Sequence, residues 1–258
     1  MITIVVFNDL QRDYHDVQSL RAVEHYLEET QPDYLVYNGD IFDFPGLTDK
    51  FLRKPEDRFR LEHSLEKGRE MFAYHRSLLP TAKFIYIKGN HEERLDNYIE
   101  ARADELAFLL KDGRGLELGS LIDAPKHGIK MIGPYGEGWE YNGFLIKHGD
   151  TSIKYASEKE LRDEGTSGMA GHNHRGGSFF KSNRGGAHAW YHNFCLCNLS
   201  GPNQPPGYKR GGVRDWQQGF SVIHFDNPTN HKRRIFNVYP VVITDHRFIA
   251  PSGIAYKP

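Results

Sequence analysis

The 258-residue sequence contains little cysteine, no long apolar run and no basic leader. Its two cysteines, Cys195 and Cys197, lie two residues apart, a spacing that suits a strand and provides no four-ligand zinc set. No apolar segment approaches the roughly 20 residues needed to span a bilayer. The chain passes directly into Ile2–Phe7 without a preceding basic segment, so a signal peptide is not expected. We expect a cytoplasmic protein without a membrane partner.

Two common catalytic loops are also missing. No Gly-x-x-x-x-Gly-Lys-Ser/Thr sequence occurs, which argues against an NTP-binding P-loop. The stretch Gly165–Met169 lacks the second glycine of a nucleophile elbow in register, which argues against an activated serine at a strand–helix turn.

The composition is that of an ordinary globular protein, with 38% hydrophobic and 26% charged residues. The net charge is only −1, but residues 175–258 contain 11 Lys and Arg against 3 Asp and Glu. The C-terminal portion is therefore basic and the remainder acidic. A basic surface would attract a polyanion such as nucleic acid, although an ordinary solvated face can carry the same charge.

Strands and helices alternate along the chain, which indicates a layered α/β fold with polar loops at the strand ends. Apolar segments predict strands at 2–7, 34–37, 84–88, 129–132, 143–147, 167–170, 190–199, 220–225 and 235–243. Helical spacing predicts helices at 16–29, 55–79, 92–111 and 154–164. Glycine-rich loops are expected at 175–187 and 201–213.

The domain organisation follows from the absence of a clear linker. We expect a single domain at 1–258. The charged segment 45–80 is expected to form a helical insertion over one edge of the site, and 175–258 to form the basic C-terminal portion.

Polar residues stand where five of the expected strands end. The five segments are Asp9-Leu10-Gln11, Gly39-Asp40-Ile41-Phe42-Asp43, Gly89-Asn90-His91-Glu92, His148-Gly149-Asp150 and Gly171-His172-Asn173-His174. Each segment alone could be a turn or a helix cap. Together they indicate a site where two divalent ions, roughly 3.5–4 Å apart, clamp the attacking and leaving oxygens of a phosphoryl displacement.

The donor atoms of these segments suit divalent cations. Asp9 and Asp40 directly follow apolar strands, where a bare carboxylate is costly unless it is paired or bound to metal. Gly39 permits a close backbone approach beside Asp40, which we expect to bridge both ions. Asn90 offers an amide oxygen. Imidazoles come from His148, His172 and His174.

This order of motifs resembles the signature of the calcineurin-like metallophosphoesterase superfamily: Asp-x-His, Gly-Asp-x-x-Asp, Gly-Asn-His-Glu/Asp, His and Gly-His-x-His. Four of the five blocks match fully, over roughly residues 2–175. The resemblance implies an α/β fold built as a four-layer α/β/β/α sandwich, with the metals at the strand ends.

The resemblance also implies a ligand set for two divalent ions, for which we expect Mn²⁺, with Zn²⁺, Fe or Mg²⁺ as alternatives. One ion would be held by Asp9, Gln11, Asp40 and His174. The other would be held by Asp40, Asn90, His148 and His172. His91 would contact the scissile phosphate or protonate the leaving group, and Asp43 would orient a ligand from behind.

Gln11 departs from the superfamily pattern, which has His at this position. An amide oxygen is a weaker and harder ligand than imidazole, so the first site would be weakened or shifted toward Mn²⁺. Three alternatives remain open: Gln11 bonds a metal-bound water, His15 takes its place, or Gln11 is a turn residue.

The resemblance implies a phosphoesterase in which a metal-bound hydroxide attacks phosphorus in line while His91 assists the leaving oxygen. Basic and aromatic residues mix in Tyr208-Lys209-Arg210 and Arg214-Asp215-Trp216, which suits single-stranded nucleic acid, although such aromatics can also anchor loops. We expect a phosphodiesterase acting on DNA or RNA, that is, a nuclease. The alternatives are a phosphomonoesterase, a small-nucleotide hydrolase, or a non-catalytic binding scaffold that Gln11 keeps open.

Overall fold

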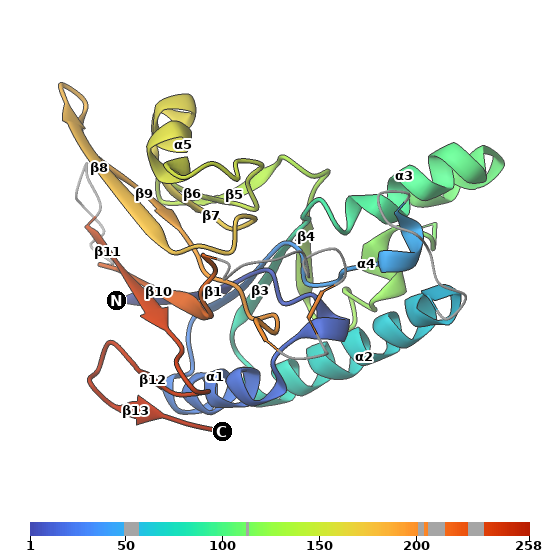
Figure 1. The fold of residues 1–258 in the computed structure, drawn as a ribbon, viewed down its shortest axis with the longest axis horizontal. Coiled ribbons are helices and arrows are strands. Elements are labelled where there is room, and N and C mark those ends of the chain that lie inside the picture. The colour runs from blue at the N-terminus through green and yellow to red at the C-terminus, as the bar shows by residue number, and fades with distance from the viewer. Residues whose placement is uncertain (49–56, 112–113, 201–203, 206–214, 227–234) are drawn as a thin grey trace.

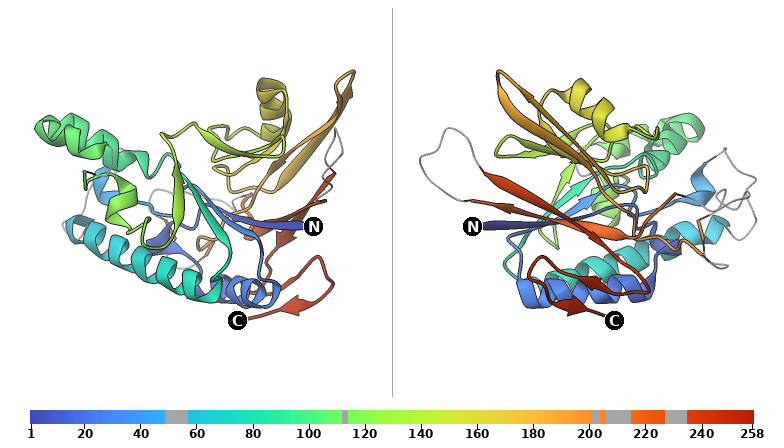
Figure 2. Two further views of the ribbon diagram at one scale, coloured as in Figure 1. Left: turned by 180° about the vertical axis from the view of Figure 1, so that it is seen from behind. Right: turned by 60° about the vertical axis from the view of Figure 1, so that its left-hand side comes forward.

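The computed structural model describes residues 1–48, 57–111, 114–200, 204–205, 215–226 and 235–258. Two β-sheets lie face to face, and helices cover the outer face of each sheet (Figures 1 and 2). The four layers are therefore helix, sheet, sheet and helix, which confirms the fold class predicted from the sequence.

The first sheet has six strands in the order β11-β10-β1-β2-β3-β4. The strands are β1 (Ile2–Phe7), β2 (Tyr34–Asn38), β3 (Lys83–Ile87), β4 (Ile129–Ile132), β10 (Gly219–Phe225) and β11 (Phe236–Val242). Strands β1 to β4 run parallel, whereas β10 and β11 pair antiparallel. The carboxyl ends of β1, β2 and β3 consequently meet at one edge of the sheet.

The second sheet has five strands in the order β5-β6-β7-β9-β8. They are β5 (Gly138–Tyr141), β6 (Phe144–Lys147), β7 (Ser167–Ala170), β8 (Gly177–Asn183) and β9 (Gly186–His192). The central strands β6, β7 and β9 are parallel, and antiparallel strands flank them on both sides.

Helices α1 (Val17–Thr30) and α2 (Asp57–Leu78) lie along the outer face of the first sheet, and α5 (Ala156–Glu164) covers the second (Figure 2). Asp16 caps α1, because its carboxylate accepts hydrogen bonds from the N–H groups of Gln18 and Ser19. Helix α2 buries Met71 and Phe72 in the core; that residues 45–80 are an insertion stays a prediction. No helix in the described part of the chain is long and apolar enough to cross a membrane.

Shorter elements complete the fold. They are the 3-10 helices η1 (Arg12–Tyr14), η2 (Pro45–Leu47) and η3 (Asp104–Leu110), helices α3 (Glu93–Arg102) and α4 (Leu118–Leu121), and the hairpin of β12 (Phe248–Ile249) and β13 (Ala255–Tyr256). The hairpin packs against α1, where the Tyr256 ring lies edge-on to Tyr26 at 5.2 Å.

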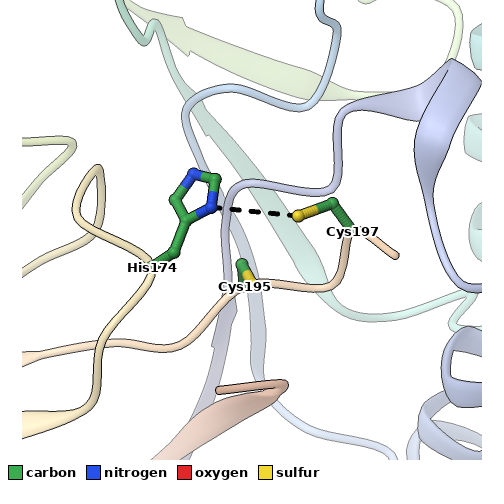
Figure 3. A group of neighbouring side chains, drawn as sticks. All are labelled: His174, Cys195 and Cys197. Carbon is green, nitrogen blue, oxygen red and sulfur yellow. Dashed lines mark hydrogen bonds between the residues drawn. The ribbon is translucent and has the colours of Figure 1, made fainter. Parts of the chain in front are cut away.

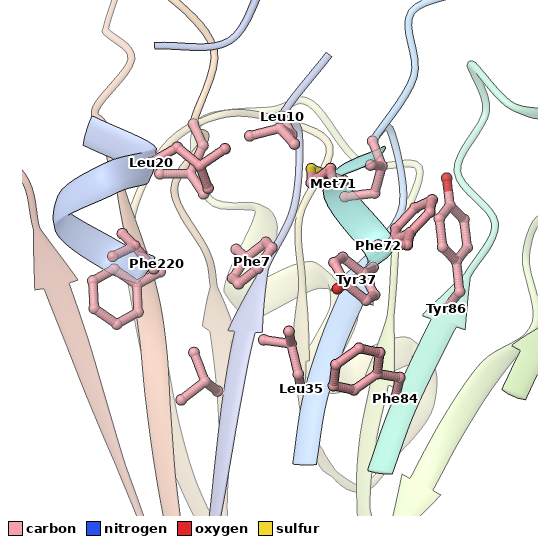
Figure 4. Packing of buried hydrophobic residues seen from close by; sticks show 14 of the residues in the cluster. Phe7, Leu10, Leu20, Leu35, Tyr37, Met71, Phe72, Phe84, Tyr86 and Phe220 are labelled. Carbon is pink, nitrogen blue, oxygen red and sulfur yellow. The ribbon is translucent and has the colours of Figure 1, made fainter. Parts of the chain in front are cut away.

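The sequence of strand β1 does not alternate between polar and apolar residues because both faces of the strand are buried. Phe7 points toward the outer helices and packs in a cluster with Tyr37 and Phe72 (Figure 4). Val6 points the other way, into an apolar cluster between the two sheets that includes Phe144. A smaller cluster around Trp190 lies between the second sheet and α5.

The structure corrects the prediction for residues 175–199. The expected loop at 175–187 is largely strand β8, all seven residues of which pair with β9; its mostly exposed, polar and glycine-containing sequence hid it. The expected strand at 190–199 ends at His192. Beyond it the chain crosses to the first sheet, where Asn193 donates to the carbonyl of Val6 at 3.0 Å and the N–H of Leu196 donates to that of Asp9 at 3.2 Å.

The predicted helix at 92–111 is also interrupted. Helix α3 stops at Arg102, and Ala103 leaves helical geometry before η3 begins. Leu95 and Ile99 of α3 are buried, but no residue of η3 is. Without a buried face, helical periodicity at 104–110 receives no support from packing.

Candidate metal centre

The polar segments identified in the sequence come together between the two sheets. Asp9, Asp40 and Asn90 follow β1, β2 and β3 of the first sheet, and His148 follows β6 of the second. His172 and His174 follow β7. Residues that are far apart in sequence thus meet because parallel strands of both sheets end at the same place.

One half of the cluster surrounds Asn90 and Asp40. The Oδ1 atom of Asn90 lies 3.2 Å from His148 Nε2 and 2.9 Å from His172 Nδ1. His148 Nε2 also lies 3.3 Å from Asp40 Oδ2. Asp40, His148 and His172 each place one ligand-type atom within 4.8 Å of the others, a spacing that one cation can satisfy.

The other half of the cluster is built on Asp9. Its Oδ1 atom lies 3.0 Å from His174 Nε2, and its Oδ2 accepts a hydrogen bond from the backbone N–H of His172 at 2.9 Å. Asn8 donates to the same Oδ2. Asp9 is completely buried, so its charge needs compensation from these neighbours or from a cation.

Gln11 is buried beside this half, yet neither its Oε1 nor its Nε2 has a hydrogen-bond partner among the described protein atoms. A buried amide rarely stays unpaired, so this side chain fits a site that a cation or its water completes. His15 does not take its place: its Nδ1 lies 2.6 Å from the carbonyl of Arg12, and its ring lines a cavity between α1 and α2.

The backbone of the cluster is held in an uncommon conformation. Asp9, Gln11, Asp40, His172 and His174 all have positive φ, between 48° and 70°. For residues with a Cβ this region costs of order 1–3 kcal/mol each. Such strain persists where the surrounding structure imposes it, and it gathers at functional sites.

Gly39 allows the first sheet to approach His148. Its φ is +77°, and a Cβ at this position would collide with the His148 ring and approach the Cα of Gly89 to 2.8 Å. In this arrangement His148 Nδ1 reaches the carbonyl of Asn38 at 2.9 Å. The close approach predicted for Gly39 is therefore present.

His91 and Asp43 form a pair at the edge of the cluster. His91 Nδ1 lies 2.6 Å from Asp43 Oδ1, and its Nε2 lies 3.6 Å from Asp40 Oδ2. Arg94 Nη1 lies 3.4 Å from the same Asp43 oxygen. Asp43 thus lies beside His91, and its expected role in orienting a metal ligand stays a prediction.

Glu92 ties the loops after β2 and β3 together. Its buried carboxylate accepts hydrogen bonds from the N–H groups of Asp40, Phe42 and Gly89 at 2.8–3.0 Å, and from the Tyr86 hydroxyl at 2.8 Å. Burial, followed by repulsion from Asp40, raises the pKa of Glu92. Sequence reasoning quoted this residue but gave it no role; its place in the Gly-Asn-His-Glu segment was the available signal.

We expect Glu92→Gln to lower the free energy of unfolding by about 2–4 kcal/mol, because one carboxylate oxygen becomes an amide that cannot accept from buried N–H groups. Urea denaturation measures this change. Glu100→Gln, an exposed change on the same helix α3, should stay within about 0.5 kcal/mol of the parent protein. Equal stability of the two variants would contradict the role given to Glu92.

The charges of the cluster are balanced in pairs. Burial opposes ionisation of Asp40, but His148 and His91 hold the pKa of Asp40 well below its usual range. Burial also opposes a charge on His148, yet Asp40 raises the pKa of His148 to about 10. Burial likewise opposes ionisation of Asp9, but His174 lowers the pKa of Asp9. Burial opposes a charge on His174, but Asp9 raises the pKa of His174. Protons thus occupy positions that a cation could take.

Several neighbours of the cluster were missed in the sequence. Asn193 donates to Asn8 Oδ1 at 2.7 Å, which holds the amide beside Asp9. The Trp216 ring lies 4.1 Å from the His174 ring, and the Tyr135 ring lies 6.1 Å from His148. Cys197 lies behind His174 (Figure 3). Trp216 was noted in the sequence only as an aromatic suited to nucleic acid, and Asn8, next to Asp9 in sequence, carried a signal that could have been used.

The donor set fits divalent cations. Carboxylate, amide and imidazole atoms converge at 2.9–3.3 Å, and both side-chain polar atoms of the buried Gln11 lack a hydrogen-bond partner among the described residues. Bound cations would satisfy these atoms and replace the protons on the histidines.

The chain is similar in sequence to two phage proteins. The chain is 24% identical to the Gene 54 protein of Mycobacterium phage D29 over 244 residues, covering 88% of this chain and 90% of that protein. It is also 24% identical to the Gene 54 protein of Mycobacterium phage L5, covering 86% and 89%.

Two solved structures are similar at low identity. Vps29 from Entamoeba histolytica, a single mutant, has a TM-score of 0.44 at 11% identity, covering 100% of this chain and 98% of that one. A dimetal phosphatase from Danio rerio has a TM-score of 0.43 at 11% identity, covering 86% and 92%.

The family comparison is decisive. The sequence model of the Calcineurin-like phosphoesterase family matches residues 2–205, a range that contains every segment of the cluster. The chain therefore belongs to the calcineurin-like phosphoesterases, a family of proteins that act on phosphate esters with divalent metals.

Proposed function

We propose that this protein is a hydrolase with a dinuclear metal site that cleaves phosphodiesters. The observation that carries the proposal is the meeting of two buried carboxylates, two amides and three imidazoles between the sheets. The first ion would be held by Asp9, Gln11, Asp40 and His174. The second would be held by Asp40, Asn90, His148 and His172. Gln11, an oxygen donor, favours Mn²⁺ in the first position.

Bound ions would supply Lewis acidity, neutralising charge on the phosphoryl oxygens and activating water for attack. The protein itself would position the groups around them. His148 is oriented by the Asn38 carbonyl, and Glu92 accepts hydrogen bonds from the backbone N–H groups of the shared ligand Asp40 and of Phe42.

His91 would act on the leaving oxygen. Asp43 holds its Nδ1, so Nε2 faces Asp40 and the interior of the site. A proton at Nε2 could pass to the oxygen that leaves phosphorus, as general acid catalysis requires. The His91 ring is buried, with a relative exposure of 4%, so its proton transfer would take place largely out of contact with bulk water.

We propose a nucleic-acid substrate because partly exposed aromatic rings stand at both ends of the cluster. Trp216 lies against His174 and Tyr135 lies near His148. Gln217 fixes the Trp216 segment: its N–H donates to the His174 carbonyl at 3.0 Å, and its side chain accepts from Gly176 at 3.1 Å. Rings beside a scissile diester could stack on flanking bases. The basic runs 209–210 and 232–234 lie outside the described residues.

Gln11 favours a second candidate, a binding scaffold that has lost catalysis, because it removes one imidazole from the first site. A phosphomonoesterase or small-nucleotide hydrolase would use the same ligands, and substrate comparison separates it from a diesterase.

The test compares bis-p-nitrophenyl phosphate with p-nitrophenyl phosphate, each with Mn²⁺ and with a chelator. Mn²⁺-dependent cleavage of the diester supports the proposal, and single-stranded and double-stranded DNA and RNA would be tested next. Cleavage of the monoester alone would show that the protein is a phosphomonoesterase and would contradict the proposed phosphodiesterase. No turnover of either ester, with no metal in the purified protein, would support the non-catalytic binding scaffold.

Metal binding should release protons and strengthen as pH rises. His148, with a pKa raised to about 10, holds a proton at neutral pH that a cation must displace, and His174 is raised in the same direction. Between pH 6 and pH 8 the apparent Mn²⁺ affinity should rise up to about tenfold per pH unit for each proton displaced. Calorimetry at pH 7 in two buffers of different ionisation enthalpy counts the protons; equal heats in both buffers would contradict this expectation.

A further inference from the structure

Three imidazoles of the cluster each have a partner on the nitrogen that faces away from the site. For His148 the partner is the carbonyl oxygen of Asn38 at 2.9 Å, and for His91 it is the carboxylate of Asp43 at 2.6 Å. For His174 the partner is sulfur: its Nδ1 lies 3.8 Å from the Sγ of Cys197 (Figure 3). A metal-ligating histidine depends on such a contact for its tautomer and orientation.

Cys197 cannot easily move away from His174. It is completely buried, and its carbonyl accepts a hydrogen bond from the Gln218 side chain at 2.9 Å. The next residue, Asn198, donates its N–H to the carbonyl of Tyr14 at 2.8 Å. The preceding residue, Leu196, donates its N–H to the carbonyl of Asp9. The segment that carries the thiol is therefore fixed to the loop that carries the first proposed ligand.

We propose that Cys197 is a positioning residue for the first metal ion, acting through His174; this inference rests on the proposed function. If Nε2 of His174 binds the ion, its remaining proton must sit on Nδ1, which then donates to Cys197 Sγ. The sulfur selects this tautomer and aims Nε2 at the space beside Asp9, 3.0 Å away. Sulfur is a weak hydrogen-bond acceptor. The contact therefore orients the His174 ring but increases the basicity of its Nε2 only moderately.

Cys195 provides a matched control. It is as completely buried as Cys197 and lies two residues away. Its thiol donates to the carbonyl of Gln217 at 3.5 Å and also contacts the thiol of Cys197. Replacing either cysteine with alanine removes one buried sulfur, but Cys197→Ala removes the sulfur that lies 3.8 Å from His174 Nδ1.

The experiment is a Mn²⁺ titration, followed by loss of the electron paramagnetic resonance signal of the free ion. Cys197→Ala should weaken binding of one Mn²⁺ about tenfold, as loss of such a partner typically does. Cys197→Ser, whose hydroxyl can accept from Nδ1, should recover most of that loss. Cys195→Ala, which removes a neighbour of Cys197 but leaves the Cys197 sulfur beside His174, should weaken binding less than Cys197→Ala does. Cys197→Val, which fills the space but accepts no hydrogen bond, replaces the alanine variant if that one does not fold.

The outcomes separate the two proposals. Parent protein that binds two Mn²⁺, with Cys197→Ala or Cys197→Val weakened and Cys197→Ser restored, supports the role of Cys197. Equal affinity of the Cys197 and Cys195 variants overturns that role while leaving the metal site in place. Parent protein that binds no Mn²⁺ overturns both.

Discussion

Replacement of Asp40 by Asn is expected to reduce phosphodiester hydrolysis about a thousandfold or more, which corresponds to a loss of about 4 kcal/mol in transition-state stabilisation. Asp40 is the proposed ligand shared by both ions. It is 1% exposed, with His148 at 3.3 Å and His91 at 3.6 Å. An amide of the same shape removes the one negative charge that both ions would share, so two cations would face each other without it.

Metal content and rate should fall together in this variant. Elemental analysis of the purified protein and hydrolysis of bis-p-nitrophenyl phosphate with added Mn²⁺ measure the two quantities. Asp163→Asn makes the same chemical change on the exposed face of α5, where the carboxylate is 54% exposed, and should leave both unaltered. An Asp40→Asn protein with full metal content and a rate within tenfold of the parent would remove Asp40 from the bridging position.

His91→Ala is expected to lower kcat by about 10²–10³-fold while both ions stay bound, because general acid–base groups contribute about that much. His91 contacts Asp43 and Asp40 but is absent from both proposed ligand sets. The loss should be larger for a diester with a phenyl leaving group than for one with p-nitrophenyl, since the poorer leaving group needs the proton more.

The comparison of leaving groups separates catalysis from positioning. His63→Ala, an exposed change on α2, serves as the control for removal of a histidine. A His91→Ala protein that loses its metal would show that His91 supports the ion site instead. An equal loss for both leaving groups would show that its proton is not used.

The strand ends were predictable because their signals are local. Apolar segments such as Ile2–Phe7 are buried on both faces and carry no competing pattern. The polar residue at the end of each strand is placed by the strand itself, so Asp9, Asp40 and His148 could each be assigned to a strand end from the sequence. The glycine beside Asp40 was readable for the same reason.

The remaining features depend on contacts between distant segments. Cys197 meets His174 only because the chain crosses from the second sheet to the first after His192. Strand β8 is set by its pairing with β9 rather than by its own polar sequence. Two of the four hydrogen bonds of Glu92 come from Asp40 and Phe42, which are 52 and 50 residues away in sequence. Neither residue spacing nor local propensity contains this information.

The proposed ligands come from both sheets: four follow β1, β2 and β3, and three follow β6 and β7. Ion binding and the packing of the sheets are then linked equilibria. Free ion at 100 times its Kd would add about 2.7 kcal/mol to the free energy of unfolding. The same linkage acts in the other direction. The rings of Phe144 and Phe225 pack between the sheets with their centroids 6.0 Å apart. A change that loosens this contact would weaken ion binding, although neither ring touches an ion.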